Sequence, residues 1–163
     1  MTPRTDGGPR SPQIRHLVDV PELVPNLVEW FSKEWGDHYG PLGPGDAETD
    51  LRTSLSRTDL PIRMVAVHAD GTLLGTVVIR AGSFSHSELT PWLGGLLVER
   101  THRRQGIGTF LVAAAEDEAR RLGYRKLYMT TDAAHSIAEG RGWRAFDVVE
   151  SERGPVTCYE VDL

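Results

Sequence analysis

Hydrophobic side chains follow two spacings along the chain, and the changes between them divide it into helical and extended segments. Residues 21–35 carry apolar side chains three or four positions apart, which is the spacing of one helix face. These positions are Leu23, Leu27, Trp30 and Phe31. Residues 36–45 are rich in glycine and proline and predict a loop. Asp46 is then suited to cap a second, more polar helix.

Extended segments dominate from residue 62 onward. The sequences IRMVAVH (62–68) and TLLGTVVIRAG (72–82) flank Asp70 and Gly71, and this dipeptide between two β-rich segments predicts a hairpin. The continuous apolar segment WLGGLLV (92–98) is typical of a buried strand. Further strands are predicted at 13–20, 126–131, 143–151 and 156–163, and further helices at 106–122 and 133–141.

The order of these elements predicts a mixed α/β fold. A strand–helix–strand crossover over residues 92–131 lies at its centre. A chain of 163 residues suits one domain, which we assign to residues 13–163. Residues 1–12 carry no apolar segment and are expected to form a disordered tail.

The composition excludes some classes of partner. With 18 basic and 23 acidic residues the net charge is −5, which argues against a nucleic-acid binder that relies on a general basic surface. The longest apolar segments fall well short of the ~20 residues of a membrane span, and no secretory signal is recognisable, so we expect no membrane association and a cytoplasmic location. The one cysteine, Cys158, fits a reducing compartment and is expected to be inert. No two histidines have the spacing of a metal pair, so no metal site is expected.

The segment ERTHRRQGIGTFL (99–111) predicts an anion site. It leads from a buried strand through a glycine-containing turn into a helix, whose first amide groups are free to bind negative charge. Gly106 and Gly108 let the backbone approach a ligand closely. The phosphate loop G-x-x-x-x-G-K-[ST] is absent, and the dinucleotide fingerprint G-x-G-x-x-G fails because Leu111 stands at its last glycine. The alternative is an ordinary helix start with solvated arginines.

Arg103, Gly106 and Gly108 form the pattern R-x-x-G-x-G, which resembles the pyrophosphate loop of the GNAT acetyltransferases. The resemblance extends over the strand, loop, helix and next strand of residues 94–131, and to the sequence EGRGWRAFD at 139–147. It implies a single-domain α/β fold with a mixed, mostly antiparallel sheet of about seven strands, a splayed central pair of strands and about four flanking helices.

The resemblance also implies that the loop binds the pyrophosphate of acetyl-CoA, with no metal. Backbone amides would hold the phosphates, and the loop residues concerned are Arg103, Arg104, Gln105, Gly106, Ile107, Gly108 and Thr109. Arg103 would support the loop or meet a phosphate. The preceding segment of Leu96, Leu97 and Val98 would splay from residues 126–131 and pair with the pantetheine arm. The Val98 amide would point at the thioester carbonyl and stabilise the negative charge that develops there.

Attack of an amine on the thioester requires a base that removes a proton from the amine and an acid that protonates the leaving thiolate. GNAT enzymes often use a glutamate on the central strand and a tyrosine in the last short helix. This chain has Trp92 and Ala138 at the corresponding positions. The remaining candidates are Glu88, His135 and Asp132, each of which is also explained as a helix cap or a surface residue. A further alternative is a water chain to solvent, with the thiolate leaving unassisted.

The acceptor is expected to lie against the segment after the first helix. Aromatic faces attract cations, so Trp35, His38 and Tyr39 are expected to contact an amine, with Trp92 as a second wall. The alternative is that these aromatic residues only cover the core. Residues 156–163 are apolar enough to pair with another chain, so a homodimer is one possible assembly.

The leading hypothesis is an enzyme that transfers an acetyl group from acetyl-CoA to a primary amine of a small molecule, peptide or protein, by direct attack of the amine on the thioester. The alternative is a catalytically silent sensor or regulatory domain that binds CoA or acetyl-CoA. The missing glutamate and tyrosine keep this alternative open.

Overall fold

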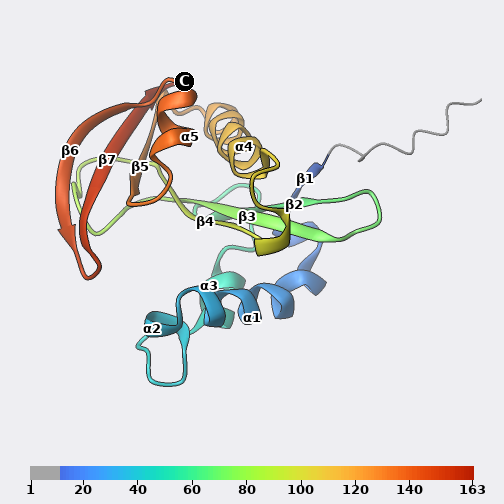
Figure 1. Ribbon diagram of the computed structural model, residues 1–163. Helices are drawn as coiled ribbons and strands as arrows, with labels where there is room; N and C mark the ends of the chain where they lie inside the picture. The colour runs from blue at the N-terminus through green and yellow to red at the C-terminus, as the bar shows by residue number, and fades with distance from the viewer. Residues whose placement is uncertain (1–11) are drawn as a thin grey trace, which may run out of the picture.

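The computed structural model describes residues 12–163, and seven strands within that range form one mixed sheet (Figure 1). The strands are β1 (Gln13–His16), β2 (Ile62–Val67), β3 (Leu73–Arg80), β4 (Trp92–Val98), β5 (Lys126–Thr131), β6 (Arg144–Ser151) and β7 (Gly154–Asp162). Their order across the sheet is β1-β2-β3-β4-β5-β7-β6. The β4–β5 pair is parallel and the other pairs are antiparallel. The tail predicted for residues 1–12 lies outside the described residues but for Pro12.

Five α-helices lie within the described range. They are α1 (Val24–Glu34), α2 (Gly36–Tyr39), α3 (Ala47–Thr53), α4 (Ile107–Arg121) and α5 (His135–Gly140). The side chain of Asp46 accepts a hydrogen bond from the Thr49 amide (3.2 Å), as expected of the residue that caps α3. The predicted single-domain α/β fold with about seven strands is therefore confirmed.

The short helix α2 lies in a stretch that the sequence predicts as a loop, and for these four residues the prediction is wrong. The amides of His38 and Tyr39 donate to the carbonyl of Trp35, at 3.0 and 2.8 Å, and so form a helical turn directly after α1. The Tyr39 ring also stacks on Phe31, with 5.6 Å between the ring centroids. Packing of this tyrosine against α1 overrides the local signal of the nearby glycines and prolines.

Helices cover both faces of the sheet. Figure 1 shows α4 and α5 on one side of the strands and α1, α2 and α3 on the other. Alternate residues of β2 therefore lie in two different hydrophobic cores. Met64 and Ala66 belong to the core under α4, and Val65 and Val67 belong to the core under α1 and α3. Burial on both faces explains why this strand has a continuous apolar sequence instead of an alternating one.

The last strand of the chain is not at an edge of the sheet. β7 lies between β5 and β6, so both of its edges are already paired. The expectation that residues 156–163 pair with a second chain is therefore wrong, because the strand has no free hydrogen-bonding edge. At this end of the described sheet the free edge belongs to β6. Homodimer formation itself stays a prediction.

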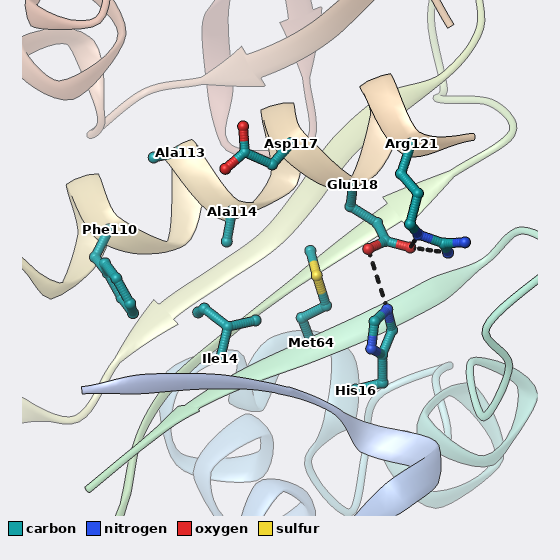
Figure 2. A pocket seen from close by; sticks show the side chains of 9 residues that line it. All are labelled: Ile14, His16, Met64, Phe110, Ala113, Ala114, Asp117, Glu118 and Arg121. Atoms are coloured by element: carbon teal, nitrogen blue, oxygen red, sulfur yellow. Dashed lines mark hydrogen bonds and ion pairs between the residues drawn. The ribbon is translucent and has the colours of Figure 1, made fainter. Parts of the chain in front are cut away.

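An ion-pair cluster ties β1 to α4 beside a hollow of about 350 Å³ (Figure 2). Figure 2 shows the Glu118 carboxylate between His16 of β1 and Arg121 of its own helix. Its oxygens lie 3.1 Å from His16 Nε2 and 2.9 Å from Arg121 Nε. Burial raises the pKa of Glu118, but the hydrogen bond from Arg121 and the close contact with His16 lower it, and the net pKa lies below its ordinary value of 4.5.

Replacing Glu118 with alanine is expected to lower the free energy of unfolding by about 1–3 kcal/mol at pH 7, because two partners lose a buried acceptor. A carboxyl with a lowered pKa stabilises the fold above its unfolded pKa, and the contribution disappears as the pH falls through the folded value. The difference between the wild type and Glu118→Ala should therefore shrink below pH 4.5. Urea unfolding at several pH values measures this difference.

Asp117→Ala, at an exposed ion pair with Arg120, is the control and should change stability by less than about 1 kcal/mol. Equal losses in the two variants would contradict the account.

Candidate functional site

The loop between β4 and α4 has two residues in left-handed backbone conformations. Glu99 first accepts a hydrogen bond from the Thr101 amide (2.9 Å) and caps the short 3-10 helix η3 (Arg100–His102). Beyond it Arg104 and Gly106 have φ angles of 64° and 81°. Such angles are uncommon for a residue with a side chain, and these turn the chain sharply before α4 begins. Gly106 is the N-cap residue of α4 and has no side chain with which to cap it.

Six consecutive amides of this loop have no partner. The N–H groups of residues 104–109 donate no hydrogen bond to any group in the described part of the chain. Residues 103–106 are exposed, so the amides are accessible to a ligand. The first amides of a helix carry a partial positive charge. A negatively charged group is therefore the ligand that this backbone suits best.

The two arginines of the loop have different environments. Arg103 donates from Nε to the Val98 carbonyl (3.1 Å), and its Nη2 lies 3.4 Å from Glu34 Oε2 on α1. It therefore braces the loop against both β4 and α1. Arg104 is exposed and has no ion-pair partner within residues 12–163. Its guanidinium remains available to an anion at the mouth of the loop.

Strands β4 and β5 diverge just before this loop. They are paired at Trp92–Tyr128 and Leu93–Met129, and no further pair joins them although both strands continue. A β-bulge at this point gives β4 one residue more than β3, and Gly95 in it has a φ of 55°. The predicted splayed central pair is therefore present.

Beyond the bulge, the Val98 amide faces the gap between β4 and β5. The amide of the next residue, Glu99, donates to Leu74 of β3 (2.8 Å). Because successive amides of a strand point to opposite edges, the Val98 N–H points away from β3. No strand pairs with β4 on that side at this position, since the pairing with β5 ends at Leu93 and Met129. The gap thus presents an unpaired strand edge, with a free donor next to the anion-binding loop.

Two hollows meet at this gap. The first, which we call the cleft cavity, has a volume of about 390 Å³ and is lined by residues 93–96 of β4, residues 129–134 at the end of β5, and Glu34, Trp35 and Arg153. The second, which we call the aromatic hollow, has a volume of about 670 Å³. It is lined by Phe31, Trp35, His38, Tyr39, Arg63, Arg80, Phe84, Gly95 and residues 150–153. The two hollows share Trp35, Gly95 and Arg153, so a ligand in one has access to the other.

Tyr39 is a fixed wall of the aromatic hollow. Its hydroxyl donates to Asp50 Oδ2 (2.6 Å). Burial and this hydrogen bond raise the pKa of Tyr39 to about 12. The phenol is therefore protonated at neutral pH and committed to Asp50, which suits a positioning role better than proton transfer.

A strand that splays beside a loop of free amides leading into a helix is the arrangement that the sequence resemblance predicts. The sequence model of the Acetyltransferase (GNAT) family matches residues 24–140. The chain belongs to this family. No curated protein matches the sequence.

Several solved acetyltransferase structures have the same fold. An aminoglycoside 6'-N-acetyltransferase complexed with coenzyme A superposes with a TM-score of 0.74 at 18% identity, over 92% of this chain and 96% of that one. A GCN5-related N-acetyltransferase from Kribbella flavida gives 0.73 at 21% identity, over 96% and 100%. The yncA protein from Salmonella typhimurium, with its cofactor acetyl-CoA, gives 0.72 at 19% identity, over 94% and 95%. At these identities the likeness establishes the fold.

Not all the proton carriers predicted for this GNAT chain lie at the gap. Asp132 lines the cleft cavity. His135 lies at the start of α5 with its Nδ1 2.9 Å from the Tyr159 hydroxyl, and it lines neither hollow. Glu88 is exposed in the loop before β4 and also lies outside both hollows. Asp132 is therefore the predicted carboxylate that the fold brings to the gap.

The predicted aromatic wall is found in part. Trp35, His38 and Tyr39 line the aromatic hollow together. Trp92 does not, because its side chain is 1% exposed and its Nε1 donates to the Leu89 carbonyl (2.7 Å). The expectation that Trp92 contacts the acceptor is wrong, and its alternative, a core position, is correct. Ala138, at the usual tyrosine position of the family, is also buried.

Several lining residues were not predicted from the sequence. They are Glu34, Arg63, Arg80, Phe84 and Arg153. One signal was available: Arg63 interrupts an otherwise apolar strand, and a charge inside such a strand is rarely buried without a role. In the described part of the chain, no cluster of metal-binding side chains is found, and no helix is long and apolar enough to span a membrane.

Proposed function

We propose that this protein binds acetyl-CoA and transfers its acetyl group to a primary amine. The observation that supports the proposal most strongly is the pair of donor sets that lie close in sequence, the Val98 amide at the gap and the six unpaired amides of residues 104–109. These donors suit a ligand with a diphosphate at one end and a polarisable carbonyl at the other. In the resulting arrangement the loop binds the pyrophosphate, and the free edge of β4 pairs with the pantetheine arm.

Groups of this chain account for the first step of the proposed reaction, the attack of the amine on the thioester. The Val98 N–H donates to the thioester oxygen and stabilises the negative charge that develops when the amine attacks the carbonyl carbon. The amine reaches this carbon through the aromatic hollow, where Trp35 and Tyr39 offer ring faces to a cation. It must lose a proton to react, and Asp132 is the predicted carboxylate that lines the cleft cavity.

Replacing Asp132 with asparagine is expected to lower kcat/KM for amine acetylation by about 10²-fold, the usual range for loss of a general base. The acetyl-CoA dissociation constant should stay within about threefold of the wild type, since asparagine keeps the shape of the side chain. Glu88→Gln removes a carboxylate that lies outside both hollows and is the matched control. Unchanged kcat/KM in Asp132→Asn would show that this carboxylate carries no proton, and that a water chain serves instead.

A CoA-binding sensor without catalysis is the second candidate function. The observation that favours it is the buried alanine at position 138, where the family often has its acid. Calorimetry with acetyl-CoA, followed by an assay of thiol release with a panel of amines, separates the two candidates. Binding with amine-dependent thiol release supports the enzyme. Binding without turnover on any amine supports the sensor.

A further inference from the structure

Arg63 is a buried guanidinium without an anionic partner. It is 3% exposed and donates from Nη1 to the Thr76 hydroxyl (3.1 Å). Its guanidinium carbon lies 5.0 Å from the centroid of the Phe31 ring. The Nε atom is buried without a hydrogen-bond partner, and no carboxylate within residues 12–163 lies at ion-pair distance. Buried charges in proteins are normally paired, so this one requires an explanation.

A second unpaired guanidinium lies beside it. Arg80, exposed at the end of β3, also has no ion-pair partner in the described residues. A Cβ atom at Gly94 would lie 3.1 Å from Arg80 Nη1, and one at Gly95 would lie 3.1 Å from Arg63 Nη2. Both guanidinium groups therefore lie over the bulge of β4, in space that the two glycines leave open. The same bulge borders the cleft cavity.

The two positive charges destabilise each other. Burial, followed by the nearby charge of Arg80, lowers the pKa of Arg63 to about 9. The negative charge of Asp50 raises the pKa of Arg63 from a distance, but the Asp50 carboxylate accepts its hydrogen bond from the Tyr39 hydroxyl and not from Arg63. A bound anion would relieve this repulsion and supply the missing hydrogen-bond acceptor. Guanidinium groups match carboxylate and phosphate oxygens in both charge and geometry.

Negative charge lies on other walls. Glu150 and Glu152 line the aromatic hollow from β6 and the turn after it, next to Arg153. Glu34 and Asp132 line the cleft cavity. From Gly95 to Val98 the strand advances three residues, or about 10 Å at the usual rise of a strand. One small molecule can span that distance with an anion at one end and an amine at the other.

We propose that the acceptor is an amine that also carries an anionic group, a carboxylate or a phosphate, which Arg63 and Arg80 bind while the amine faces the thioester carbon beside the Val98 amide. Arg63 forms the floor of this anion site and Arg80 its exposed wall. The inference rests on the proposed acetyltransferase function and adds the class of its substrate. Polycationic amines are a poor match for a site whose floor and wall are both guanidinium groups.

The test compares acceptors in pairs that differ only in the anion. An α-amino acid is compared with its carboxamide, and phosphoethanolamine with ethanolamine, and an aminoglycoside serves as the polycation. The wild type should acetylate at least one anionic member with a kcat/KM at least tenfold above that of its neutral partner. The pair in which this occurs distinguishes a carboxylate from a phosphate.

Variants at Arg80 link this preference to the anion site. Arg80→Gln should raise KM for the anionic acceptor about tenfold or more and leave kcat and the neutral acceptor within about threefold. Arg80→Lys, which keeps the charge, should recover part of the loss. Arg120→Gln, on the exposed face of α4, is the control and should leave both acceptors unchanged. Arg80 is exposed, so these variants test the site without disturbing a buried position.

Two results would overturn the proposal in distinguishable ways. If neutral or cationic amines are acetylated as well as the anionic ones, or if Arg80→Gln affects both members of a pair equally, the anion site is wrong and the acetyltransferase function stands. If acetyl-CoA binds and no acceptor of any charge is acetylated, the proposed function fails and the inference fails with it.

Discussion

Replacing Gly106 with valine is expected to weaken acetyl-CoA binding at least tenfold. This residue has a φ of 81°, in a region that a β-branched residue rarely adopts. A left-handed residue with a side chain costs about 1–2 kcal/mol, and relief of that strain would turn the free amides of residues 104–109 away from the ligand. A loss of about 1.4 kcal/mol in binding free energy corresponds to a tenfold change in Kd. Titration calorimetry with acetyl-CoA measures it.

Gly123→Val is the matched control for this change. Gly123 has a φ of 93°, faces open space as Gly106 does, and follows the other end of the same helix. The helix is about 22 Å long at 1.5 Å per residue, so the control carries similar strain far from the loop. It should lower the melting temperature and keep the dissociation constant within about twofold. Similar losses of affinity in both variants would show that the loop is not the phosphate site.

Replacing Val98 with proline is expected to lower kcat by about 10²–10³-fold, which is the usual cost of removing one donor from an oxyanion site. Proline removes the N–H and fixes φ of this residue, and because this amide points away from β3, no bond between β3 and β4 is lost. The Val98 carbonyl still accepts from Arg103. Steady-state kinetics at saturating acetyl-CoA gives kcat directly.

Val98→Ala keeps the amide and changes only the side chain, so it separates the two contributions. We expect its kcat to stay within about threefold of the wild type. Melting curves with and without acetyl-CoA confirm that both variants fold and bind. A proline variant that turns over as fast as the alanine variant would contradict the role given to the amide.

The loop of free amides before α4 could be predicted because its signal is local. A glycine at position 106 and a helix beginning immediately after it fix the direction of neighbouring amides whatever the rest of the chain does. The buried strand of residues 92–98 and the Asp46 cap are equally local features, and the structure has both. The spacing of residues in the sequence is sufficient to predict a feature when one segment of the chain supplies the whole interaction.

Features that depend on which strands are neighbours could not be predicted in this way. The order of β6 and β7 in the sheet decides that residues 156–163 have no free edge, and the chain order alone does not give it. Arg63 and Arg80 come together only because β2 and β3 pair in the observed register, with Arg63 opposite Val78. Trp92 is buried because Tyr128, which is distant in sequence, packs against its ring together with His86 of the preceding loop.

The central claim is that this chain moves an acetyl group from acetyl-CoA to an amine, and transfer of a labelled acetyl group tests it most directly. Purified protein is incubated with acetyl-CoA labelled in the acetyl group and with anionic, neutral and cationic amines, and the label is followed by mass spectrometry. The account predicts that the label appears as an amide on an amine, in proportion to the free thiol released, and that Val98→Pro slows its appearance. Label that stays on acetyl-CoA, or that is released only as acetate whatever amine is present, would contradict it.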